Sequence, residues 1–120
     1  MQNPETINKD ISNEIRYLNA LLGVFIAYNN NLSKFNELAV LKNLSKDSHA
    51  EFIAREILKF DNIKENIAKH YSSNELSTIL QRHINRLINY IQHNNVEGVR
   101  LELGEIILVL KKSKAELGGQ

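Results

Sequence analysis

The sequence predicts an all-α protein: a single-domain bundle of four to five helices, in which a long N-terminal helix packs on a C-terminal antiparallel helical hairpin. Three observations carry this prediction. Apolar residues recur at spacings of three and four along most of the 120-residue chain. No stretch alternates apolar and polar residues for long enough to form a half-buried strand. Pro4 is the only proline, so this residue interrupts no later helix.

Length and composition favour one domain over residues 1–120. A chain of this length with 42% hydrophobic residues can bury one core without a metal or a disulfide. The sequence contains no cysteine, which excludes disulfides, thiol nucleophiles and cysteine-ligated zinc.

The first helix is expected from Pro4 to about Tyr28. Asn3 is a suitable N-cap and Pro4 suits the first helical position, while the run Asn29-Asn30-Asn31 ends the helix. Its inward stripe is Ile7, Ile11, Ile15, Leu18, Leu22 and Phe25. Three more residues make its last third apolar nearly all round: Leu21, Val24 and Ile26. We therefore expect that part to be the most buried.

Two shorter helices are expected in the middle of the chain. Ser33 can cap the first of them, which would run to about Leu44. The capping-box pattern from Ser48 to Glu51 predicts the start of the next helix. Their inward residues are Phe35, Leu38, Leu41, Phe52, Ile53, Ile57 and Phe60. At Asp61 this helix either breaks or continues through Tyr71, and the sequence leaves both possibilities open.

The last two helices have the clearest signals. Ser72-Ser73-Asn74-Glu75 is a second capping box, Asn94 and Asn95 separate the two helices, and Gly118 is placed as a C-terminal cap. The first of the two carries Leu76, Leu80, Ile84, Leu87 and Ile91. The second carries Val96, Val99, Leu103, Ile106 and Leu110. Because about two residues connect them, they must form an antiparallel hairpin.

Charge and hydropathy exclude several classes of function. The 15 basic and 14 acidic residues alternate along the chain and leave a net charge of +1, which disfavours nucleic-acid binding. The polar N-terminus MQNPETINKD does not resemble a secretory signal, and no apolar run approaches the roughly 20 residues that span a bilayer. We expect a soluble cytoplasmic protein with no membrane contact. Lys, Ile and Asn are abundant, and we expect a bacterial or phage origin.

The stretch QRHINRLINYIQH, residues 81–93, gathers chemically capable side chains beside the apolar stripe: Ile79, His83, Arg86, Tyr90 and His93 form one line. The spacing Arg86-x6-His93 resembles the R-x(4–6)-H pattern of the HEPN ribonucleases, whose scaffold is also a helical hairpin. The resemblance covers this one helix. It implies a metal-independent RNase in which Arg86 and His93 act on the scissile phosphate across a dimer. The alternative is a solvated flank in which His and Tyr lie over the edge of the core with their polar tips in water.

A metal or cofactor site is not expected. His83 and His93 lie ten residues apart, which is about 15 Å along a helix and too far to share one ion. His49 and His70 lack a partner at a familiar ligand spacing. The sequence also has no glycine-rich phosphate loop and no G-x-S-x-G motif.

A DNA-binding alternative starts from residues 38–60, where two short helices and a polar turn suggest a helix-turn-helix. The helix that would enter a groove is residues 61–70. Its Lys64 and Lys69 are offset by two acidic residues, and it lacks an arginine for bidentate guanine contacts. An ordinary bundle crossing explains the same pattern.

The final helix carries more apolar surface than one neighbouring hairpin covers: Leu101, Ile107, Leu108 and Val109 lie outside its main stripe. Either this helix is central in the bundle or part of it meets a partner. Our leading hypothesis is a protein that acts by binding another protein, as an adaptor, inhibitor, immunity factor or chaperone does. The favoured assembly is a homodimer, and the interface candidates are Leu101, Leu108 and Val109. An enzyme is the less favoured class.

Overall fold

The computed structural model describes residues 4–33, 46–71 and 74–118, with side chains from residue 10 and from residue 50 in the first two ranges. Within these ranges the chain forms four α-helices and no strand: α1 Pro4–Asn30, α3 Lys46–His70, α4 Glu75–Gln92 and α5 Val96–Glu116. The all-α prediction is confirmed. The short helix expected from Ser33 to Leu44 lies outside the described residues except for its first position.

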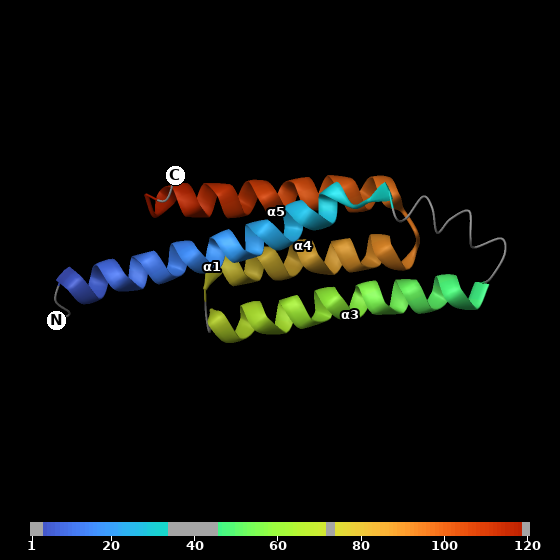
Figure 1. Ribbon diagram of the computed structural model, residues 1–120, viewed down its shortest axis with the longest axis horizontal. Coiled ribbons are helices and arrows are strands. Elements are labelled where there is room, and N and C mark those ends of the chain that lie inside the picture. The colour runs from blue at the N-terminus through green and yellow to red at the C-terminus, as the bar shows by residue number, and fades with distance from the viewer. Residues whose placement is uncertain (1–3, 34–45, 72–73, 119–120) are drawn as a thin grey trace.

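The helices are arranged as an up-and-down bundle, in which consecutive helices run in opposite directions (Figure 1). Helix α1 packs along α5, α5 along α4, and α4 along α3. Helices α1 and α3 meet through aromatic side chains, including the pair Phe25 and Phe60. The ring of four helices therefore closes around one core, and the N-terminal helix lies on the C-terminal hairpin as expected.

The core is formed by the stripes predicted for the last two helices together with residues of α1 and α3. The side chains with almost no exposure are Leu18, Phe25, Phe60, Ile67, Leu80, Ile84, Leu87, Ile91, Val99, Leu103, Ile106 and Leu110. Fully burying one such side chain contributes about 1.5–3 kcal/mol, so these residues supply most of the driving force.

Parts of the predicted α1 stripe are wrong. Ile11 is 37% exposed, because the first turns of α1 extend past the other helices (Figure 1). Val24 and Ile26 are also exposed, whereas their neighbours Leu21 and Leu22 are buried. The last third of α1 thus buries one face only, because α5 and α3 cover a single side of it.

The choice left open at Asp61 is settled: α3 is continuous from Lys46 to His70. Ser48 lies inside this helix, so its capping-box pattern does not mark the start that the sequence suggested. Residues 61–70 form no helix of their own. The separate recognition helix that the helix-turn-helix alternative requires is therefore missing.

Asparagine side chains cap the C-terminal hairpin. Asn74 caps α4 by accepting a hydrogen bond from the Leu76 backbone at 2.6 Å, so the cap is two residues later than Ser72. Asn95 caps α5 by accepting from the Gly98 backbone at 3.0 Å. Gly118 has φ of +82° and follows the end of α5. The predicted caps at Asn95 and Gly118 are confirmed.

Candidate functional site

The polar line on α4 lies along its contact with α5. Tyr90 covers Gly98 so closely that a Cβ on this glycine would stand 2.6 Å from Tyr90 Cγ. One turn before Tyr90, Arg86 reaches toward α5, and two turns before it His83 does the same; both meet Glu102. Within residues 81–93, His83 and Tyr90 are therefore half-buried against α5, while Arg86 and His93 are exposed.

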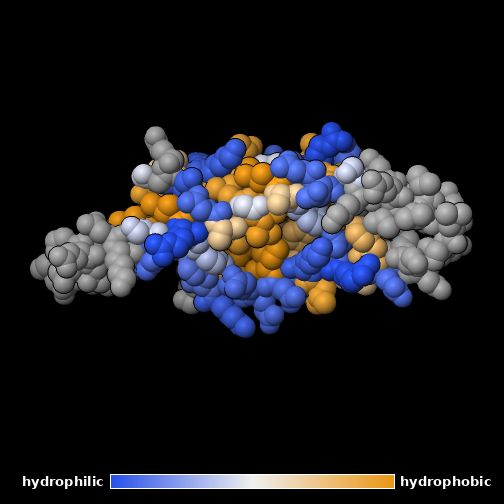
Figure 2. All heavy atoms as spheres, viewed as in Figure 1, coloured by the Kyte–Doolittle hydropathy of each residue, from blue (hydrophilic) through white to orange (hydrophobic). Residues whose placement is uncertain are grey.

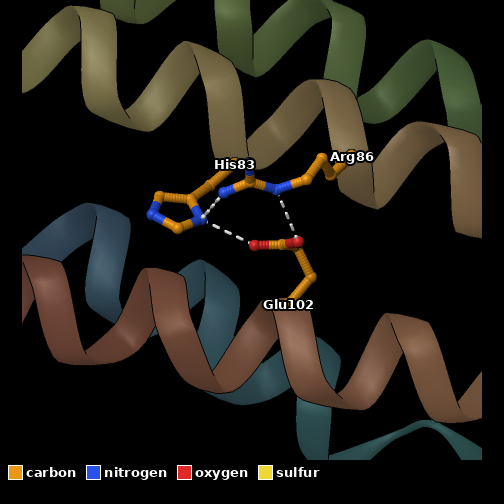
Figure 3. Close-up of polar contacts among 3 residues, drawn as sticks. All are labelled: His83, Arg86 and Glu102. Atoms are coloured by element: carbon orange, nitrogen blue, oxygen red, sulfur yellow. Dashed lines mark hydrogen bonds and ion pairs between the residues drawn. The ribbon is translucent and has the colours of Figure 1, made fainter.

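Two side chains of α4, His83 and Arg86, bind the Glu102 carboxylate (Figure 3). Its Oε2 lies 2.6 Å from His83 Nδ1, and its Oε1 accepts a hydrogen bond from Arg86 Nε at 3.0 Å. The Glu102 side chain is only 8% exposed. A carboxylate taken out of water at this depth is tolerated when both oxygens are paired, as they are here.

The partners of His83 fix its tautomer. Nδ1 lies 2.6 Å from a carboxylate oxygen and 3.0 Å from Arg86 Nη2, a group that can only donate. Nδ1 cannot donate to Glu102 and accept from Arg86 at once. Because a bond to a carboxylate is the stronger one, Nδ1 carries the hydrogen and donates to Glu102. The Nε2 atom of His83 then faces away from this pair (Figure 3).

Arg86 and His93, the pair carried over from the ribonuclease resemblance, have different partners. Arg86 binds Glu102, while His93 Nδ1 lies 2.8 Å from the Asn89 carbonyl oxygen of its own helix. They lie seven positions apart, which is about 10 Å along the helix axis. The structure thus brings His83, rather than His93, to Arg86.

Sequence reasoning missed Glu102, although one signal was present. Position 102 stands three residues after Val99 and four before Ile106, so it falls on the buried side of α5. A charged residue at such a position needs a partner from another helix. The line of His83 and Arg86 on α4 was the matching half of this signal.

A second polar cluster joins α1 to the end of α3. The rings of Tyr17 and His70 stack with centroids 3.6 Å apart. Tyr71 donates a hydrogen bond to Glu14, and His70 Nε2 lies 3.1 Å from the other Glu14 oxygen. Tyr17 also donates to Asn66 Oδ1 at 2.7 Å. Burial, and to a smaller extent the hydrogen bond to Glu14, raises the pKa of Tyr71, so this phenol stays neutral. The cluster thus joins α1 to α3 through polar contacts.

Glu56 on α3 is a further buried carboxylate, with only 3% of its surface exposed. It forms an ion pair of 2.9 Å with Lys59. Burial and the neighbouring Glu56 raise the pKa of Tyr28, whose ring also meets Phe60 edge-on at 4.8 Å. This group therefore ties α1 to α3 at the other end of their contact.

The three interface candidates on α5 are placed differently. Leu101 and Leu108 are each 63% exposed, whereas Val109 is half-buried and lines a pocket at the end of the bundle. Gly104 lies between the two leucines on the same side of the helix, and a Cβ there would meet nothing within 4 Å. We call Leu101, Gly104 and Leu108 the α5 outer face.

Among the described residues, no cluster of three His, Asp or Glu side chains has the geometry to hold a metal ion. None of the four described helices combines the length and the apolar character needed to cross a bilayer. No family model, curated protein or solved structure matches this chain.

Proposed function

We propose that this protein acts by binding another protein chain through the α5 outer face. The observation that supports this proposal is the exposure of Leu101 and Leu108, which lie two turns apart on one side of α5. A single exposed leucine is ordinary on a protein surface. Two aligned leucines with a glycine between them form a continuous apolar strip, which is the form that helix-to-helix recognition takes.

The occupant we propose for this face is α5 of a second copy, running antiparallel. If the two-fold axis passes beside Gly104, Leu101 of one copy stands level with Leu108 of the other. Glu97 then stands level with Lys112, so opposite charges meet at both ends of the contact. Gly104, which has no side chain, allows the two helices to approach closely at the axis. Glu105 remains at the edge of the strip, in water.

Light scattering over a range of protein concentrations tests the assembly. The wild type is expected to move from 13.8 kDa toward twice that mass as concentration rises. Leu108→Lys should remain monomeric because it places a charge in the apolar strip of each copy. Leu58→Lys is the matched control, since Leu58 is 58% exposed on α3, away from this face. Circular dichroism shows whether each variant keeps its helices.

Two further variants test the antiparallel register. Glu97→Lys should weaken the dimer, and the double variant Glu97→Lys with Lys112→Glu should restore it, because the opposite charges then face each other again. A wild-type monomer at all concentrations would refute self-association. A dimer that Leu108→Lys leaves intact would show that another surface is used.

A further inference from the structure

A pocket of about 700 Å³ opens at the end of the bundle that contains the start of α4 and the last turns of α5. Helix α1 forms its third wall. The apolar part of the lining is Leu18, Leu76, Ile79, Val109 and Leu117. This volume lies within the range of about 300–1,000 Å³ that is typical of sites for small organic ligands.

The pocket exists because apolar residues continue along α4 and α5 past the point where the helices pack closely. On α4 the last fully buried side chain at this end is Leu80, while Leu76, one turn earlier, is only half-buried. Past Leu110, the apolar residue Leu117 follows directly after the end of α5 and is 36% exposed. Figure 2 shows apolar side chains that reach the surface along the middle of this face and toward the end where α1 leaves the bundle. Water covers apolar surface here that a ligand could cover instead.

The charged lining is predominantly acidic, with three carboxylates and one ammonium group: Glu14, Glu75, Glu116 and Lys112. Glu14 is already bonded to His70 and Tyr71. Glu75 and Glu116 are both exposed, one from α4 and one from α5. These two carboxylates can therefore approach a charged group on a ligand.

Of the two helix ends at this pocket, the end of α5 favours a positive charge, and the start of α4 is capped. The Leu76 backbone N–H, which could bind an anion at the start of α4, already donates to Asn74, and Glu75 adds a negative charge beside it. The end of α5 contributes the negative pole of its helix dipole. An anionic ligand would thus meet a capped helix start and like charges.

We infer that this pocket binds an organic cation with an apolar body and one ammonium group. The apolar body lies against Leu76, Ile79 and Val109, and the ammonium group lies near Glu75 and Glu116. None of the three residues of the α5 outer face lines the pocket, and Lys112 is the one residue that the pocket shares with the proposed dimer contact. The two proposals can fail independently.

Titration with octyltrimethylammonium, followed by two-dimensional NMR of the labelled protein, tests this inference. Octanoate has a chain of the same length and the opposite charge, and it serves as the matched probe. Titrations use the Leu108→Lys variant below the micelle concentration, so that dimer formation does not contribute. We expect shifted amide signals in the pocket residues, and binding of the cation at least about tenfold tighter than that of octanoate.

Three variants test separately the role of the carboxylate charges and the role of the pocket volume. Glu75→Lys combined with Glu116→Lys should reverse the preference in favour of octanoate. Glu105→Lys is the control, because Glu105 is an exposed acid of α5 outside the pocket. Val109→Trp should fill the pocket and abolish binding of both probes. The absence of shifts at millimolar cation, or equal binding of both probes that the charge reversal leaves unchanged, would overturn the inference.

Discussion

Replacing Gly98 by alanine should destabilise the bundle, although alanine is the better helix former. In a helix interior the exchange favours folding by up to about 1 kcal/mol, and by less in the first turn, where Gly98 lies. The new Cβ would stand 2.6 Å from Tyr90 Cγ and 2.8 Å from Tyr90 Cε1. Carbon atoms pack at about 3.5–4.0 Å, so the ring must shift by roughly 1 Å. Overpacking of this kind costs about 1–3 kcal/mol, which leaves a net loss of about 0.5–2 kcal/mol.

Urea unfolding followed by circular dichroism measures this change. Gly23→Ala on α1 is the matched control, because a Cβ there meets nothing within 4 Å, and it should raise stability by up to about 1 kcal/mol. In a Tyr90→Ala background, Gly98→Ala should no longer destabilise the protein. If Gly98→Ala stabilised the wild type as much as Gly23→Ala does, the close packing of Tyr90 on Gly98 would be refuted.

Three further outcomes are expected. Glu102→Ala should lower the free energy of unfolding by about 1–3 kcal/mol, because it leaves two donors of α4 without their buried acceptor, while Glu105→Ala should change it by less than about 0.5 kcal/mol. The folded-state pKa of Tyr71 is raised above the ordinary 10.0, so the neutral phenol's contribution to the free energy of unfolding is present below pH 10 and is lost as pH rises beyond it. In urea titrations at alkaline pH, Tyr71→Phe should therefore lose less stability with rising pH than the wild type does. RNA incubated with purified protein should remain intact, because Arg86 is engaged by Glu102; cleavage that disappears in both Arg86→Ala and His93→Ala would favour the ribonuclease alternative instead.

The C-terminal hairpin was predictable because its information is local. A stripe at spacings of three and four specifies the buried side of α4 and α5 without knowledge of their neighbours. The same holds for Asn95, whose side chain accepts from a backbone group three residues later. The cap of α4 was less certain, since Ser72 and Asn74 are both good capping residues and the path of the chain into the helix decides between them.

The remaining features depend on contacts between distant segments. Ile11 fits the α1 stripe, but it is exposed because no other helix extends that far. Glu102 looks like a surface residue by composition, and it becomes a buried one only because α4 supplies His83 and Arg86. The pocket could not be predicted either, because it forms where the start of α4, the end of α5 and the middle of α1 leave a space between them.

The pairing of the first helix with the last has a consequence for how the bundle opens. Helices α3, α4 and α5 follow one another through short connections, so their mutual contacts form at a small entropic cost. Helix α1 meets α5 across most of the chain length, so its docking closes a longer loop at a larger entropic cost. We therefore expect α1 to detach first in native-state hydrogen exchange, with its amides less protected than those of α4. Helix α1 also lines the end pocket, so a ligand bound there would slow this detachment. Hydrogen exchange would detect the bound ligand as stronger protection of the α1 amides, although α1 lies far in sequence from most of the residues that line the pocket.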